Sequence, residues 1–306
     1  MEIINNNNKN GKMKQLVFKP YNFGLAFLKM ILALTVIGSH CFKNSSTNNN
    51  IFLFFYKRRR IHVPSFMIMS FYFMQKSLIS SNFKLLCRRL IRLGIPYLCW
   101  PIIIFFLNNN ILNLLGIGKK ILLYDLINQL LWGESFIIQF WFQWDLFFIT
   151  ILFFILISFC RKNHLFVLQL LGILSYVLQY SEYNLKFYKK IGKNCLGRIA
   201  EMVPYATTGF TFGTYKTIDY LKKYKYKTFI LSLLIFILTD KYNIFIRPNG
   251  IAYSGIKHNI RAICLIFLFS LLSLENIKNK LLFNIIKELS NYTAGIFYLH
   301  WTVSIF

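Results

Sequence analysis

The sequence predicts an all-α membrane protein, a polytopic transmembrane helix bundle of about nine to ten spans. Three observations lead to this prediction. Of the 306 residues, 56% are hydrophobic and 18% aromatic, which exceeds the apolar share of an average globular protein. The chain has 33 phenylalanines and only 10 acidic residues, which is more apolar surface than a solvated, disordered chain tolerates. Finally, apolar runs recur along the chain between charged or asparagine-rich stretches.

A helix needs about 20 apolar residues to cross the hydrocarbon core of a bilayer, and the apolar runs approach this length. We expect spans at residues 22–42, 61–75, 93–112, 136–160, 165–181, 199–215, 228–246, 259–274 and 290–306. Segment 121–132 is amphipathic and too short to span. We expect it to lie in the membrane interface or to re-enter the membrane, and it could form a tenth span.

The expected organisation is a polar, basic tail at residues 1–20 followed by one membrane domain at residues 21–306. Lysines and arginines are somewhat more frequent in the loops that a cytoplasmic N-terminus would place inside, so we predict a multi-pass integral membrane protein with that orientation. The basic run at residues 57–60 opposes it. Because the last apolar run stops at Phe306, a truncated C-terminal span is one interpretation.

The net charge of +26 raises the question of a nucleic-acid partner. The basic residues are scattered between apolar runs and do not form one patch, so we interpret them as loop charges and expect membrane lipids, and no nucleic acid, as partners. The 6 cysteines are far apart and lack the short spacing of a metal or redox site, so no metal is expected. Nucleotide-binding loops and the nucleophile elbow of hydrolases are also missing.

Ionisable side chains inside a membrane are costly, so each is a candidate functional residue. His40 ends the first apolar run, where a neutral imidazole could take a proton from a hydroxyl; a hydrogen bond to a carbonyl is the alternative. Arg88, Arg89 and Arg92 precede the third run and could bind phosphate or only anchor the helix. Asp145 could orient a histidine or could be an interfacial acid.

Weaker candidates are Glu201 and His300, which lie in or beside apolar runs, and the hydroxyls of Ser70 and Tyr72 in the second run. Structural hydrogen bonds are the alternative for all of them, because hydroxyls in helices are most often satisfied by a carbonyl one turn back.

The order of these residues resembles the acyltransferase 3 family of integral membrane acyltransferases. The family's Arg-x10-His resembles Lys29-x10-His40, with lysine in place of arginine. Its second-span pattern, Val-Pro-Leu-Phe-Phe-x-x-Ser-Gly-Tyr, resembles residues 63–72, with Phe71 in place of the glycine. Its Arg-Arg-x-x-Arg-x-x-Ile-Pro-Tyr-x-x-Trp segment is similar to residues 88–100.

Two further segments carry the same resemblance. Residues 141–146, which begin with Trp141, match the family's Trp-Phe-x-x-Asp-Leu, and residues 295–300 look like its closing Gly-Ile-Tyr-x-x-His. The resemblance implies a bundle of about ten spans, a cytoplasmic acyl-CoA donor, commonly acetyl-CoA, and transfer to a hydroxyl of a carbohydrate or lipid-linked glycan.

In the mechanism that the resemblance implies, Arg88, Arg89 and Arg92 hold the CoA phosphates and His40 acts as general base. Asp145 would set the tautomer of His40, and Lys29 would counter charge on the thioester oxygen. Other candidate site residues are Ser70, Tyr72, Trp141, Glu201 and His300. A multispan transporter or flippase, and a catalytically inactive family member, are the alternatives.

Overall fold

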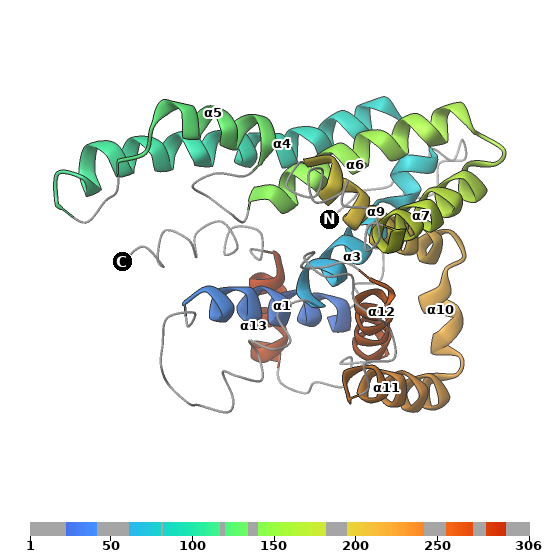
Figure 1. Ribbon diagram of the computed structural model, residues 1–306. Coiled ribbons are helices and arrows are strands. Elements are labelled where there is room, and N and C mark those ends of the chain that lie inside the picture. Colours follow the sequence, from blue (N-terminus) through green and yellow to red (C-terminus); the bar gives the residue numbers. More distant parts are fainter. Residues whose placement is uncertain are drawn as a thin grey trace, which may run out of the picture.

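The computed structural model describes residues 23–41, 61–80, 82–116, 120–133, 140–181, 195–241, 255–271 and 280–291 (Figure 1). Its helices are α1 (Phe23–Cys41), α3 (His62–Ile79), α4 (Phe83–Phe106), α5 (Leu123–Trp132), α6 (Phe140–Phe159), α7 (His164–Ser181), α9 (Cys195–Thr214), α10 (Thr217–Lys222), α11 (Lys225–Lys241), α12 (Ile256–Ser270) and α13 (Lys280–Asn291), with a π-helical turn η2 (Leu107–Leu112) after α4. These ranges contain no strand, which confirms the all-α prediction.

Two helical segments in the described ranges are long and apolar enough to cross a membrane, Phe83–Leu112 and Phe140–Phe159. Phe23–Val36 and His164–Tyr180 are shorter apolar helices. The number of nine to ten spans therefore remains a prediction. An exposed apolar stripe of Ile91, Ile95, Leu98 and Ile102 runs along α4. Its helical spacing and length are those of a surface that faces lipid.

Helices α3 and α9 form the most closely packed pair, at the centre of the bundle (Figure 1). Gly209 of α9 lies directly against the backbone of Ile68, and one turn later Gly213 lies against the carbonyl of Tyr72 and the side chain of Gln75. Small residues at this spacing let two helix backbones approach within a membrane. The register also shows that α3 and α9 run in the same direction.

Phe71 stands where the acyltransferase 3 pattern has glycine, and the structure shows how its bulk is accommodated. Its side chain is 0% exposed, and its ring packs against Phe153 of α6 with centroids 4.7 Å apart. The close contact between α3 and α9 is made at Ile68, Tyr72 and Gln75, where the glycines of α9 supply the space.

We expect Gly209→Ala to destabilise the protein, because the added Cβ would overlap the carbonyl oxygen of Ile68 and the backbone cannot move aside as a side chain can. Overpacking of this kind costs about 1–3 kcal/mol. The matched control is Gly94→Ala in α4, where the nearest atom to the new Cβ is a ring carbon of Phe147 at 3.9 Å. Thermal unfolding in detergent should show a lower midpoint for Gly209→Ala alone. Equal midpoints for the two variants would contradict this account.

Helix α7 runs antiparallel to α9. The Gln179 amide near the end of α7 donates to the carbonyl of Ala200 near the start of α9, at 3.0 Å. At the other ends of the two helices, the rings of His164 and Phe210 lie 6.1 Å apart. The start of α7 therefore lies beside the end of α9.

Helix α4 runs antiparallel to α6 in the same way. The rings of Tyr97 and Phe140 lie 6.2 Å apart, and those of Phe83 and Phe154 lie 6.4 Å apart. The start of α4 is thus beside the last turns of α6. Because α4 follows α3 after a short connection, these contacts bring the ends of α3, α6 and α9 to one end of the bundle.

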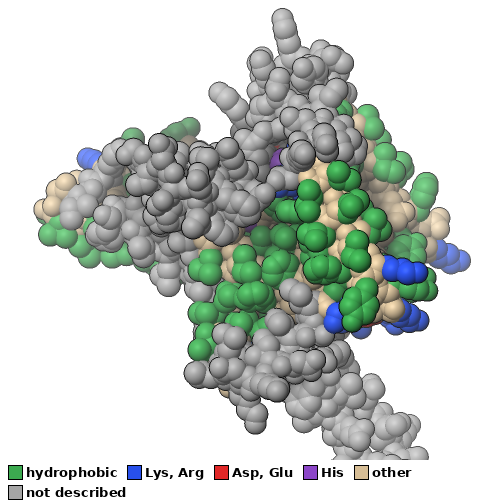
Figure 2. Space-filling view, turned by 90° about the horizontal axis from the view of Figure 1, so that it is seen from below, with side chains coloured by type: hydrophobic (Ala, Val, Ile, Leu, Met, Phe, Trp, Pro, Cys, Tyr) green, Lys and Arg blue, Asp and Glu red, His purple; other side chains and the backbone are tan. Residues whose placement is uncertain are grey.

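We call this end of the bundle the basic end, because exposed lysines and arginines gather there. They are Lys76, Lys84, Arg161, Lys162 and Lys216. In Figure 1 it lies on the right, where α6 turns back into α7 and α10 begins. Figure 2 shows most of the visible basic side chains along the right-hand edge, next to a broad apolar surface. The predicted spans place the connections that follow α3, α6 and α9 on one side of the membrane, and these three connections share one end of the molecule.

Helix α4 begins ten residues before the predicted span at residues 93–112. Its N-cap is Asn82, whose side-chain oxygen accepts a hydrogen bond from the backbone N–H of Leu85 at 3.3 Å. Lysine, arginine and leucine are good helix formers, and the long stems of the basic residues can reach the surface while their backbone stays helical. The arginine cluster is therefore on the helix itself and not in a loop before it.

The asparagine run at residues 108–110 lies within η2 and does not form a loop. The Asn109 amide donates to the carbonyl of Ile121 at 2.8 Å, and its oxygen accepts from the Ile121 N–H at 2.9 Å. This pair of bonds fixes the point where the chain returns, so that α5 lies back along α4 (Figure 1). The amphipathic segment thus folds back beside α4, and whether it re-enters the membrane remains a prediction.

Candidate active-site region

The buried charge that the sequence analysis singled out, Asp145, is paired with an arginine. Its Oδ1 lies 3.5 Å from Nε of Arg198, with the two side chains 0% and 10% exposed. Asp145 belongs to α6 and Arg198 to the first turn of α9. A carboxylate and a guanidinium that are both removed from water stabilise each other only as a pair.

Arg198 is held in an aromatic cage. Its guanidinium carbon lies 5.6 Å from the ring of Trp144 and 6.0 Å from the ring of Trp141. Its Nη2 also donates to the carbonyl of Trp132, at the end of α5, at 2.7 Å. The pair therefore ties three helices together, and the indole faces partly replace the water that the cation has lost.

The helices around this pair are joined by further polar contacts. The hydroxyl of Tyr97 in α4 donates to the carbonyls of Gln129 and Leu130, at 2.7 and 2.8 Å. The indole N–H of Trp144 donates to the carbonyl of Leu131 at 3.0 Å. Together these bonds give side-chain partners to carbonyls of the last turn of α5, of which the Gln129 carbonyl also accepts from the backbone N–H of Gly133.

Gly133 ends α5 and makes room for the cage. Its φ of 72° lies in the left-handed region, which glycine adopts without strain. A Cβ at this position would lie 2.9 Å from Cβ of Trp144 and 3.1 Å from Cα of Trp141. The turn therefore has both a conformational and a steric reason to be glycine.

Arg198 is not among the predicted site residues, because it lies among the charges that precede the predicted span at residues 199–215. One signal could have identified it: a buried acid such as Asp145 requires a cation nearby. The alternative partner was His40. That residue lies in α1, but its side chain is outside the part of the chain that the structure describes, so its contact with Asp145 remains a prediction.

The arginine cluster extends inward from the basic end. Arg88 and Arg92 are exposed and Arg89 is half-buried. Arg92 immediately precedes Leu93, whose carbonyl accepts a hydrogen bond from the side chain of Gln143. Since Gln143 is two residues before Asp145, the last arginine lies at a similar depth to the buried carboxylate along the two antiparallel helices.

Lys29 and His40 both lie in α1, where the Lys29 side chain is half-buried. Eleven residues correspond to about three helical turns, or roughly 16 Å along the axis of α1.

The remaining predicted site residues are dispersed. Ser70 and Tyr72 are half-buried on α3, and Glu201 is buried one turn after Arg198 on α9. Trp141 takes part in the cage of Arg198. His300 is outside the described residues. The structure thus brings Trp141 and Asp145 together with Arg198, and it leaves Ser70 and Tyr72 on a different helix.

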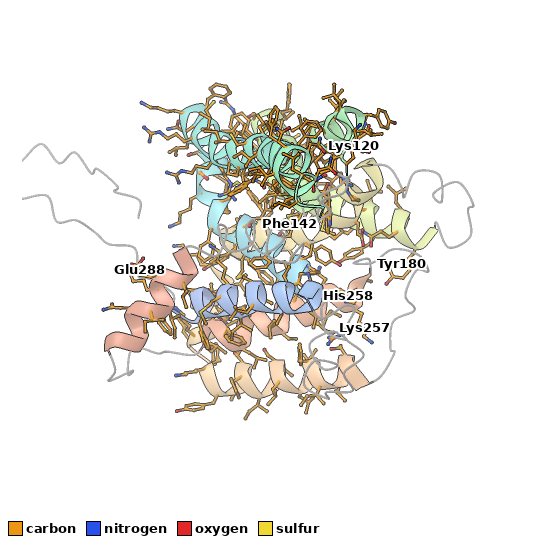
Figure 3. All side chains as sticks on the ribbon, turned by 90° about the vertical axis from the view of Figure 1, so that its left-hand side faces the viewer. Lys120, Phe142, Tyr180, Lys257, His258 and Glu288 are labelled. Atoms are coloured by element: carbon orange, nitrogen blue, oxygen red, sulfur yellow. The ribbon has the colours of Figure 1, made fainter. Side chains whose placement is uncertain are left out.

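A second polar cluster joins α7, α9 and α12. The Asn259 amide donates to the hydroxyls of Tyr176 and Thr208, at 2.6 and 3.0 Å. Where α12 begins, the backbone N–H of Ile256 donates to the hydroxyl of Tyr180 at 3.3 Å, and Figure 3 shows Tyr180 and His258 at these neighbouring helix ends. Hydrogen bonds of this kind hold apolar helices in register.

A family model described as an acyltransferase domain matches residues 22–306, which is nearly the whole chain. The match includes every candidate residue from Lys29 to His300. Comparisons with curated proteins and with solved structures give no significant match.

Proposed function

Because the chain belongs to the acyltransferase 3 family and is therefore an acyltransferase, we propose that it moves an acyl group from cytoplasmic acyl-CoA to a hydroxyl of a carbohydrate or lipid-linked glycan. Acetyl-CoA is the proposed donor. The family consists of membrane proteins, and the two apolar helices long enough to span a bilayer agree with this setting.

The observation that supports the donor is the position of the arginine cluster on α4. Arg88 and Arg92 are exposed on the part of α4 that leads from the basic end inward to the depth of Asp145. An excess of positive charge favours the basic end as the cytoplasmic side. The planar guanidinium group binds phosphate with two parallel hydrogen bonds. Bound there, CoA phosphates would lie near the basic end, and the thioester could extend toward the depth of Asp145.

In the proposed reaction, His40 takes the proton of the acceptor hydroxyl, and the oxygen of that hydroxyl attacks the carbonyl carbon of the thioester. The new C–O bond forms, the C–S bond breaks, and the CoA thiolate leaves and takes up the proton. Asp145 is proposed to orient His40. Lys29 supplies a long-range positive field that favours the negative charge developing on the thioester oxygen.

The donor-binding role is tested with Arg88→Gln/Arg92→Gln. We expect KM for acetyl-CoA to rise by about tenfold to a hundredfold, because a hydrogen bond to a charged group contributes about 1.5–3 kcal/mol. The loss should appear mainly in KM, as for an interaction made equally in the ground and transition states. Incorporation of radiolabelled acetyl groups into membrane glycans measures the rate.

The matched control is Lys76→Gln/Lys84→Gln, which removes two exposed charges from the same end of the bundle and should leave KM within about twofold. An equal rise in both double variants would assign the effect to general charge. Absence of any labelled product from the unaltered protein, across glycan pools, would support the inactive alternative and reject the proposal.

A further inference from the structure

The segment that leads from the end of α9 into the first turn of α11, residues 215–227, combines exposed lysines with exposed tyrosines, and we call it the Lys–Tyr segment. Its lysines are Lys216, Lys222, Lys223, Lys225 and Lys227, all exposed. The segment has a single acidic residue, Asp219, whose Oδ1 lies 4.0 Å from Nζ of Lys222. The segment therefore carries a concentrated positive charge.

The backbone of this segment is fixed to the bundle, so its charges have a defined position. Lys216 adopts a left-handed conformation with φ of 49° and turns the chain sharply after α9. Ile218, two residues later, is buried in the main hydrophobic core. The hydroxyl of Thr228 donates to the carbonyl of Leu221 at 3.4 Å. Ile218 thus anchors the inner side of α10 and leaves the lysines outside.

The tyrosines of the segment are exposed in the same way as the lysines. Tyr215, Tyr220, Tyr224 and Tyr226 all face outward, and Tyr226 is 82% exposed. The rings of Tyr220 and Tyr224 lie 5.7 Å apart, and Nζ of Lys223 lies 5.9 Å from the ring centroid of Tyr220. Tyrosines are enriched at the headgroup level of membranes, where one part of the ring is apolar and the hydroxyl is wet.

Helix α11 continues beyond the Lys–Tyr segment, and from residue 229 onward its exposed side chains are apolar. They include Ile230, Leu231, Leu234 and Ile237. Figure 2 shows this arrangement as an apolar surface beside basic side chains at the right-hand edge. The change from lysine and tyrosine to isoleucine and leucine indicates where a bilayer's headgroup layer would give way to its hydrocarbon core.

We propose that the Lys–Tyr segment is a binding surface for anionic phospholipid headgroups on the side of the membrane that the basic end faces. Clusters of four to eight basic residues next to a membrane helix attract acidic lipids, and each basic residue near the surface contributes about fivefold in affinity. The lysines supply the charge, and the tyrosines hold the segment at headgroup depth. This surface is separate from the arginines of α4 and does not depend on the transfer reaction.

The test is a titration of the full-length protein in neutral detergent with fluorescent phosphatidylglycerol, followed by anisotropy. In Lys222→Gln/Lys223→Gln/Lys225→Gln/Lys227→Gln the affinity should fall at least about tenfold. A variant with arginine at the same four positions should keep the affinity of the unaltered protein for phosphatidylglycerol. Added salt should weaken binding to the unaltered protein, since the Debye length falls to about 3 Å at 1 M ionic strength.

A matched control removes four other basic side chains from the same end, in Lys76→Gln/Lys84→Gln/Arg161→Gln/Lys162→Gln, and should lower the affinity clearly less than the variant of the Lys–Tyr segment does, because these residues lack the neighbouring exposed tyrosines. Equal losses in the two quadruple variants, or equal affinity for phosphatidylcholine, would overturn the proposal. Displacement of the lipid by soluble CoA would also overturn it and would assign the segment to the donor.

Discussion

His40→Ala is expected to lower the rate of acyl transfer by about 10²- to 10⁴-fold, the usual contribution of a general base. The loss should appear in kcat, because deprotonation of the acceptor hydroxyl assists the transition state and not donor binding. Transfer of radiolabelled acetyl groups in membranes measures it, with the amount of folded protein determined from the same samples.

The matched control for His40 is His164→Ala. His164 begins α7 at the basic end, where its Nδ1 lies 2.8 Å from the carbonyl oxygen of Arg161, and no catalytic role is assigned to it. We expect the rate of acyl transfer by His164→Ala to stay within a few-fold of the rate of the unaltered protein. Near-normal transfer by His40→Ala would exclude the imidazole as the base, whereas an equal loss in both variants would indicate a structural effect.

Asp145→Ala is expected to destabilise the protein by about 3–5 kcal/mol, the cost of removing one partner of a buried ion pair. Arg198 would keep its indole neighbours and its bond to the carbonyl of Trp132, but these do not neutralise its charge. The midpoint of thermal unfolding in detergent should fall, together with the yield of monodisperse protein.

The double variant Asp145→Ala/Arg198→Met separates the ion pair from the packing of either side chain. Because an apolar side chain of similar length carries no charge that requires a partner, we expect the double variant to recover part of the stability lost in Asp145→Ala. A double variant that loses as much as the two single variants combined would contradict the pairing. Recovered stability without recovered acyl transfer would support the role proposed for Asp145 in orienting His40.

The sequence predicted many of the described helices, because a long apolar run by itself favours a helix in a bilayer, whereas α13 (Lys280–Asn291) lies almost wholly between two predicted spans. Predicted spans at residues 136–160 and 165–181 correspond to α6 and α7, since an apolar run of sufficient length has few alternatives to a helix in a bilayer. The local motifs also follow one another in the order that is typical of the family. The family match to residues 22–306 confirms the resemblance drawn from these motifs. Helix starts were less predictable, as α4 shows, because arginine-rich turns are neither apolar nor incompatible with a helix.

Residues 108–110 show a different limit of the sequence. Asparagine runs are typical of loops, but Asn109 instead bonds the backbone of Ile121. The amide group of an asparagine can always make such bonds. Which backbone groups it bonds is decided only when the chain folds back on itself.

The amino-acid sequence by itself determined that the chain is helical, apolar and a member of an acyltransferase family, because composition, run length and motif order are properties of single segments. Only the tertiary structure decided that Asp145 pairs with Arg198 beside two tryptophans, and that Gly209 and Gly213 of α9 lie against the backbone of α3. The physical reason is that ion pairs and helix contacts depend on which side chains face each other across the bundle, and residues far apart in sequence meet there through packing.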